Sequence, residues 1–405
     1  YEIAQCLVGS EMCIRDRGNM SAMFTKDTVV LDVTSSRVTA IVGCKKALSV
    51  YDIKARTERS YDGYADGEFF DADGAAEAMT SALCEAIDKT AVPAKRVYIG
   101  VPGEFVTLID RPVTVTLDRV RRVVDADIDY LIAKGGRFDY AERVLIGSSP
   151  VCYTVDTSDR SFFDVRGMTA GKVSATVSYM LADRTFTELA ESAARRAGFR
   201  DVRFVATPWA ECVAMFEREQ RDAAYVVIDA GYLSSSVAVG RGEGLDELKS
   251  FSMGGGHVAA DIYEVLGVPF PLAEEAKELV DLNLSYSDDA VLVADGSNVI
   301  RAAEACEIVR ARLEYFAEVV ANVIASTDTP TYIPVYLTGE GFTSIRGART
   351  VLSAGLGRTV ELCAPKVPGF TRPEDSSAIS LFTVAETMQK NDRNILKRVF
   401  NGGKK

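Results

Sequence analysis

Two stretches of the chain share one pattern of apolar and polar positions. Residues 28–43, TVVLDVTSSRVTAIVG, contain an apolar run that includes Asp32, a Thr/Ser turn and a second apolar run. Residues 225–240, YVVIDAGYLSSSVAVG, repeat that order with Asp229 in the corresponding place. Apolar runs joined by short turn sequences predict β-hairpins. Two such hairpins, one opening each half of the chain, predict a duplicated α/β architecture with a ligand between the halves.

Further segments follow the hairpins. Apolar residues at helical spacing predict helices at 73–90, at 125–135, from Thr185 to Gly198, from about Pro208, and at 301–326. Thr185 and Glu188 have the spacing of a capping box, and Gly198 is placed to end that helix. We also expect a strand at 96–103, a glycine-rich turn leading into a helix at 250–262, and a strand, Gly-x-Gly turn and helix at 334–345. The β-rich block at 104–182 predicts an inserted subdomain.

Composition narrows the classes of function. The 405 residues, 47% hydrophobic and 26% charged, predict a folded protein with more than one lobe. A net charge of −12 argues against a nucleic-acid partner, which needs a basic surface. Eight cysteines without a C-x-x-C pair and a single histidine argue against zinc sites and histidine-dependent catalysis, and they fit a reducing cytosol. No uninterrupted apolar run approaches the roughly 20 residues that span a bilayer.

The first residues stand apart from this pattern. Residues 1–22 have no basic start followed by an apolar core, as a signal peptide would, and the strand pattern begins only at Thr28. We predict that residues 1–22 are a non-native or disordered extension and that the natural start is Met20 or Met23.

The order of the motifs resembles a known superfamily. The two Asp-bearing hairpins, VYIGVPG, GGGHVAADI and LTGEG occur as in the actin/Hsp70/sugar-kinase superfamily. Three passages, RVYIGVPG before the insertion, VRGMTAGKVSATVSYMLA and RRAGFRDVRFVATPWAE, resemble the FtsA family of bacterial actin homologues. The resemblance runs from Thr28 to the C-terminus. It implies an α/β fold of the actin-like ATPase type, with two duplicated RNase H-like lobes and an inserted β-rich subdomain.

The resemblance also implies a division of the chain. Lobe 1 is expected at 24–104, 183–224 and 373–389, with the last segment as its closing helix. The FtsA-type subdomain is expected at 105–182, lobe 2 at 225–372 and a basic amphipathic tail at 390–405.

In this superfamily ATP and Mg²⁺ lie between two phosphate hairpins, where acidic residues hold hydrated metal and glycines let backbone amides approach phosphates. The resemblance therefore implies ATP and Mg²⁺ as cofactors, with Asp32 and Asp229 nearest the metal. The implied nucleotide-binding positions are Asp32, Thr34, Ser35, Ser36, Asp229, Gly231, Ser234, Ser235, Gly254, Gly255, Gly256, Gly339, Glu340 and Gly341.

Four departures weaken this site. Thr34 stands where the family has Gly, Tyr232 and Leu233 add bulk in the second hairpin, Ser236 replaces a carboxylate, and Thr207 replaces the acid that polarises the attacking water. Phosphoryl transfer depends on positioning and electrostatics, so these losses predict weak or absent hydrolysis and no catalytic residues. They leave nucleotide binding open.

The C-terminal tail carries its own signal. Residues 390–405 contain six basic residues and one acidic residue, a net charge of 6 − 1 = +5. Apolar Ile395, Leu396, Val399 and Phe400 share one face of a helical turn, beside Lys397 and Arg398, and such a helix binds anionic lipid. The alternative is a solvated basic tail.

Two classes of function remain open. The leading one is an FtsA-like scaffold of cell division, cytoplasmic and peripheral on the inner face of the membrane. It would link an FtsZ-like tubulin homologue to anionic lipid, self-associate into filaments and use a degenerate nucleotide site. The alternatives are an actin-fold ATPase, kinase or chaperone-type enzyme, and an adaptor like the pilus-assembly protein PilM, which shares the FtsA layout.

Overall fold

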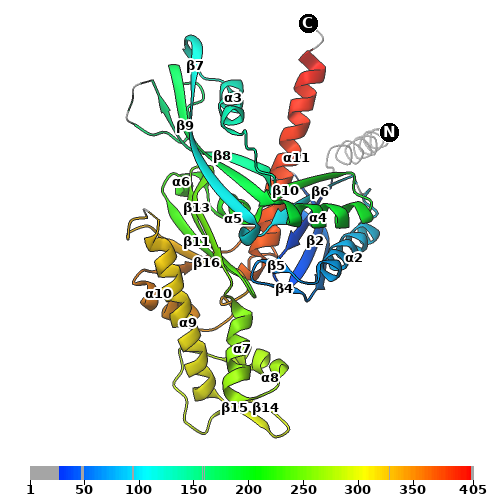
Figure 1. Ribbon diagram of the computed structural model, residues 1–405, viewed down its shortest axis with the longest axis vertical. Helices are drawn as coiled ribbons and strands as arrows, with labels where there is room; N and C mark the ends of the chain where they lie inside the picture. Colours follow the sequence, from blue (N-terminus) through cyan, green and yellow to red (C-terminus); the bar gives the residue numbers. More distant parts are fainter. Residues whose placement is uncertain are drawn as a thin grey trace, which may run out of the picture.

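Two five-stranded sheets with the same topology form the body of the protein (Figure 1). The computed structural model describes residues 27–46, 50–93, 95–156, 158, 160–327 and 329–402, with backbone alone for 391–402. The predicted extension at 1–22 lies outside the described residues.

Each sheet is built around its Asp-bearing hairpin. In lobe 1, β1 (Thr28–Val33) pairs antiparallel with β2 (Arg37–Lys45), which pairs with β3 (Tyr51–Ser60). On the other side β1 pairs parallel with β6 (Arg96–Val101), and β6 with β10 (Asp201–Ala206).

Lobe 2 repeats the arrangement. The order is β13 (Gly244–Phe251), β12 (Ser235–Arg241), β11 (Tyr225–Ala230), β16 (Val335–Thr338) and β17 (Val360–Leu362). The first two pairings are antiparallel and the last two parallel, as in lobe 1. The duplication predicted from the two hairpins is therefore confirmed.

Helices cover both faces of the lobe 1 sheet, which explains why every residue of β1 is buried. Val29 and Leu31 belong to the same core as Met79 and Leu83 of α2 (Ala72–Thr90), beside α4 (Arg184–Arg196). Val30 lies in the core on the opposite face, with α5 (Thr207–Met215) and the first half of α11 (Ser376–Gly402).

One face of the lobe 2 sheet has a core of its own, whereas Tyr225 and Val227 on the other face belong to the core of lobe 1. Lobe 2 also has an outer part far from lobe 1 (Figure 1). Its helices are α7 (Gly255–Leu266), α8 (Phe270–Leu279), α9 (Ala302–Ala325) and α10 (Ala348–Leu356). A small hairpin of β14 (Val291–Asp295) and β15 (Asn298–Arg301) lies at the outer end.

A third unit stands between β6 and α4 in the chain. Strands β7 (Val106–Arg122), β9 (Thr169–Asp183) and β8 (Arg143–Val155) form one antiparallel sheet. The helix α3 (Asp125–Gly135), at its predicted bounds, packs on that sheet with a core of its own. The shorter elements are β4 (Tyr64–Ala65), β5 (Glu68–Phe69), η2 (Gly103–Phe105), α6 (Arg218–Arg221) and η3 (Pro373–Asp375).

Two local predictions are wrong. The helix α4 begins at Arg184, because the Asp183 carboxylate accepts a hydrogen bond from the Thr185 amide at 2.8 Å and so caps the helix. No helix follows the Gly-x-Gly turn directly: residues 340–347 form turns, and α10 starts at Ala348. The Gly341 amide donates to the Ala230 carbonyl at 2.6 Å, which holds this segment against lobe 2.

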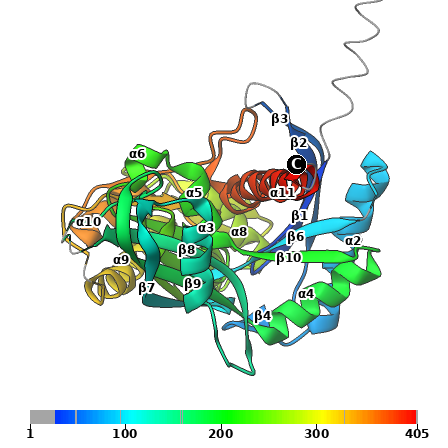
Figure 2. The ribbon, with the colours of Figure 1, turned by 90° about the horizontal axis from the view of Figure 1, so that it is seen from above.

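The helix α11 starts in the core and continues out of the body (Figures 1 and 2). Ile379, Leu381 and Phe382 are fully buried in lobe 1. The backbone stays helical to Gly402, through Ile395, Leu396, Lys397, Arg398, Val399 and Phe400. The side chains of these six tail residues lie outside the described part of the chain. No helix among the described residues is long and apolar enough to cross a bilayer.

Candidate functional site

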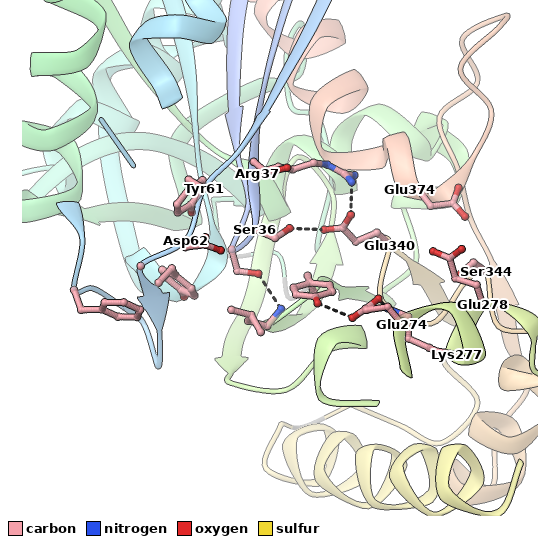
Figure 3. A pocket seen from close by; sticks show the side chains of 17 residues that line it. Ser36, Arg37, Tyr61, Asp62, Glu274, Lys277, Glu278, Glu340, Ser344 and Glu374 are labelled. Atoms are coloured by element: carbon pink, nitrogen blue, oxygen red, sulfur yellow. Dashed lines mark hydrogen bonds and ion pairs between the residues drawn. The ribbon is translucent and has the colours of Figure 1, made fainter. Parts of the chain in front are cut away.

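A cleft of about 670 Å³ lies between the lobes, where the turns of the two Asp-bearing hairpins meet (Figure 3). Lobe 1 lines it with residues 35–37, 60–64 and Phe70, and lobe 2 with Tyr232, Leu233, residues of α8 and Glu340. Both hairpins place polar turn residues here because their strands end at this edge of each sheet.

Side chains of the two lobes contact each other across the cleft. The Arg37 guanidinium forms an ion pair with the Glu340 carboxylate at 2.5 Å, and Ser36 Oγ donates to Glu340 Oε1 at 3.3 Å (Figure 3). The Leu233 amide donates to Ser35 Oγ at 2.9 Å. The first hairpin, the second hairpin and the turn after β16 are thus joined directly.

The predicted serines and threonine are bonded to protein groups. Thr34 Oγ1 donates to the Arg37 carbonyl within its own turn, and Ser235 Oγ donates to the Met253 carbonyl. Ser234 Oγ donates to Glu104 Oε1 at 2.9 Å. None of these three residues is among those that line the cleft, whereas Ser35, Ser36 and Glu340 are.

The predicted glycines lie together beneath the cleft and pack on one another. A Cβ atom on Gly341 would lie 2.3 Å from the Gly231 carbonyl oxygen, and one on Gly254 would lie 2.2 Å from the same atom. A Cβ on Gly255 would meet the Gly341 carbonyl at 2.5 Å, and one on Gly256 would meet the Tyr232 ring. Gly339 has φ +89° and passes close to the Ala230 carbonyl. Glycine is needed here for close approach of backbone to backbone.

The glycine amides of these loops already have acceptors. Gly255 and Gly256 donate to the carbonyls of Gly231 and Tyr232, at 3.0 and 2.8 Å, and Gly231 donates to the Ser234 carbonyl. The Gly254 amide donates to His257 Nδ1 at 3.2 Å, which gives the single histidine a structural role. A phosphate group would have to displace these partners, since each amide supplies one donor.

Asp32 and Asp229 lie below the cleft, in register on equivalent strands. Asp32 is 1% exposed and accepts a hydrogen bond from Ser377 Oγ at 2.6 Å, while its Oδ1 atom has no partner. A Cβ on Gly100 would lie 2.7 Å from Thr207 Oγ1 and 3.0 Å from Asp32 Oδ1. Thr207 Oγ1 is also buried without a partner, so two unsatisfied polar atoms flank Gly100.

Burial raises the pKa values of the carboxyl groups of Asp32, Asp229 and Glu211. Burial raises the pKa of Asp32 to about 6, although the Ser377 hydrogen bond opposes the shift. Desolvation, followed by the negative charge of Asp32, raises the pKa of Asp229 to about 7. Burial also raises the pKa of Glu211, whose Oε1 atom accepts from Ser376 Oγ at 2.8 Å.

The residues that line the cleft do not fit a nucleoside triphosphate with its metal ion. The charged side chains that line the cleft are Asp62, Glu274, Glu278, Glu340 and Glu374 against Arg37 and Lys277. Both cations are already paired, Arg37 with Glu340 and Lys277 with Glu274 at 2.5 Å. Among the described residues, no group of three or more Asp, Glu, His or Cys side chains is placed to share a metal ion. An acidic lining repels phosphate, and the amides of Gly231, Gly254, Gly255 and Gly256 are occupied.

Sequence reasoning missed several residues of this site. Four residues could be assigned to the site only from the fold, because their partners are distant in sequence: Arg37, Tyr64, Glu104 and Glu274. Glu211 lies in the passage ATPWAE, in which the family resemblance points only to Thr207 as a departure from the nucleotide site. Its signal was an acidic residue inside an otherwise apolar helix, α5, where an ionisable group is rarely fully buried without a partner.

Relatives with curated functions are cell-division proteins. No protein-family model matches the chain. The chain is 26% identical over 294 residues to the cell division protein FtsA of Streptococcus pneumoniae, which covers 72% of this chain and 63% of that protein. It is 22% identical over 378 residues to FtsA of Bacillus subtilis, which covers 88% of this chain and 83% of that protein.

Solved structures show the same architecture. The PilM–PilN type IV pilus biogenesis complex contains a chain that matches with a TM-score of 0.59 at 16% identity, over 89% of this chain and 98% of that one. MreB5 of Spiroplasma citri bound to ADP matches with a TM-score of 0.56 at 11% identity, over 91% and 99%. The α/β fold is therefore the predicted actin-like one, and by sequence and fold the chain is a divergent FtsA-like actin homologue.

Proposed function

We propose that this chain is a scaffold of cell division that links a filament of an FtsZ-like tubulin homologue to the inner face of the cytoplasmic membrane. The observation that carries the proposal is the likeness to FtsA, which in the Bacillus subtilis comparison covers 88% of this chain and so extends over both lobes and the unit inserted in lobe 1. The lack of fit between the cleft and a nucleotide supports a scaffold over an ATPase, kinase or chaperone-type machine.

The division into lobe 1, inserted subdomain, lobe 2 and tail is part of this proposal. The sheet of β7, β8 and β9 has its own core and stands away from the outer part of lobe 2, so two separate surfaces are available to partners (Figure 1). The helix α11 leaves the body as a continuous helix that leads into the basic residues of 390–405. We propose that this end lies on anionic lipid, and that self-association into filaments gathers many weak anchors.

Binding to assembled FtsZ tests the partner. We expect the purified chain to co-sediment with FtsZ filaments in a saturable way and to remain in the supernatant when FtsZ is unassembled, because a scaffold gains avidity from a repeated surface. The measurement is the bound fraction across a titration of filaments. A fraction no greater than that of an unrelated acidic protein of similar size would contradict this partner.

A PilM-like adaptor is the second candidate, favoured by the TM-score of 0.59 to the PilM–PilN complex. Such an adaptor would bind a short peptide segment rather than a filament. Saturable binding of a PilN-type peptide, with no retention on FtsZ filaments, would favour the adaptor. An enzyme of the same fold would instead turn over ATP clearly faster than its own Asp229→Ala variant.

A further inference from the structure

The contacts across the cleft use Ser35, Ser36 and Glu340, three positions that the family resemblance implies for a nucleotide. We propose that the chain's own side chains, rather than a ligand, hold the two lobes in their observed relative arrangement. The inter-lobe clamp consists of Ser35, Ser36 and Arg37 from lobe 1 with Leu233 and Glu340 from lobe 2. This inference goes beyond the proposed function, since neither a filament nor a membrane enters its test.

In the clamp, side chains of this protein make the polar contacts that a bound ligand would make. Glu340 supplies the negative charge that Arg37 meets at 2.5 Å, and its other oxygen accepts from Ser36. The Ser35 hydroxyl oxygen accepts a hydrogen bond from the Leu233 amide at 2.9 Å. It therefore replaces the ligand oxygen that this amide of the second hairpin would otherwise bind. Each of the three turns that would surround a phosphate is therefore bonded to a partner turn of the same chain.

Solvent exposure places the ion pair in the range where it contributes to stability. The Arg37 side chain is 28% exposed and that of Glu340 is 16% exposed. A charge-assisted pair with reduced solvation is stronger than one at the open surface, and a second hydrogen bond fixes its geometry. Behind the cleft, the Trp209 indole nitrogen donates to the Glu243 carbonyl at 2.9 Å. Ser234 Oγ also donates to Glu104, and Tyr225 and Val227 share a core with lobe 1, so opening of the clamp would not separate the lobes.

The relative arrangement of the lobes should consequently be independent of nucleotide. ATP–Mg²⁺ would enter an acidic cleft, break the Arg37–Glu340 pair and compete with carbonyl acceptors for the loop amides. The binding free energy of such a ligand is reduced by the free energy of the native contacts that it must break. The lobes of this protein would then keep one relative position while it acts as a scaffold.

Hydrogen exchange measured by mass spectrometry tests the clamp on the full chain. For Glu340→Ala we expect amide exchange in peptides covering 30–38, 229–236 and 338–346 to accelerate roughly tenfold, the change that loss of one charge-assisted hydrogen bond produces. Asp261→Ala is the matched control, because Asp261 pairs with Arg312 at 2.5 Å and similar exposure, 25% and 21%, within lobe 2 alone. It should leave the peptides of the first hairpin unchanged.

Two further measurements keep the result decisive. The double charge swap, Arg37→Glu with Glu340→Arg, should restore slow exchange in the first hairpin, which a merely misfolded variant would not do. Millimolar ATP–Mg²⁺ should leave exchange of the unaltered chain the same in all three peptides. Equal exchange in Glu340→Ala and Asp261→Ala would overturn the proposal, as would strong protection of the hairpins by ATP–Mg²⁺.

Discussion

The variant Asp32→Asn should be more stable than the unaltered protein at pH 8, by on the order of 2 kcal/mol. Asp32 is 1% exposed, and burial raises its pKa to about 6 from a usual value near 4. Asn keeps an oxygen for the Ser377 hydroxyl. The substitution thus removes a buried charge without removing the acceptor of that hydrogen bond.

The sign of the pH dependence follows from proton binding. Between about pH 4 and pH 6 the folded protein holds a proton on Asp32 that the unfolded chain has lost, so the Asp32 contribution to stability falls as pH rises through this window. From about pH 7 upward, nearly the full cost of ionisation is present. The advantage of Asp32→Asn should therefore grow from pH 4 to about pH 7 and then stay constant.

Urea unfolding between pH 4 and pH 8, with and without millimolar Mg²⁺, measures this effect. Asp288→Asn is the control, because it removes the same charge from an exposed position. A difference in unfolding free energy that does not change with pH, or a loss of stability in Asp32→Asn, would contradict the raised pKa of the buried Asp32 carboxyl group. Stabilisation of the unaltered protein by Mg²⁺ that is absent from Asp32→Asn would instead show a working metal site.

A chain ending at Gln389 should lose at least about tenfold in affinity for anionic vesicles, because basic residues near an anionic surface each contribute on the order of 1 kcal/mol. The truncation removes a net charge of +5 together with Ile395, Leu396, Val399 and Phe400. It leaves the packed part of α11 intact, including the Gln389 amide that donates to Thr28 Oγ1 at 2.7 Å. The body should therefore remain folded.

A pair of substitutions separates the apolar face from net charge. Leu396→Glu places a carboxylate on the face expected to enter the lipid, and Asn394→Glu places one on the opposite side of the helix. We expect vesicle binding to fall further in Leu396→Glu than in Asn394→Glu, measured by co-sedimentation with anionic vesicles. If the truncated chain binds as well as the full chain, the tail is only a solvated basic segment.

Local patterning predicted the fold well where each signal is carried by neighbouring residues. The two hairpins, α2, α3 and α9 follow from the spacing of apolar residues, and the bounds of α3 agree with the prediction. The start of α4 differs from the prediction, because Asp183 rather than Thr185 provides the capping oxygen. Both residues are of a type that can cap a helix, and the sequence alone does not decide between them. The turns at 340–347 could not be predicted, since they depend on packing against Ala230 and Gly231.

The site was less accessible to sequence reasoning. Asp32 and Asp229 are recognisable because they recur in register, and the losses at Tyr232 and Leu233 are visible in the hairpin sequence. The ion pair of Arg37 with Glu340 joins residues about three hundred positions apart, and no local pattern marks it. Glu340 was expected to contact nucleotide; the structure places it in contact with Arg37 and Ser36.

The direct test of the scaffold is flotation of vesicles with fluorescent FtsZ filaments. The proposed function predicts that FtsZ floats with anionic vesicles only when the full chain is present, and that it stays at the bottom with the chain ending at Gln389. The Asp32→Asn variant should carry FtsZ as well as the unaltered chain does, because hydrolysis is not required. FtsZ that floats equally with the truncated chain, or that never floats with the full chain, would contradict a link between filament and membrane.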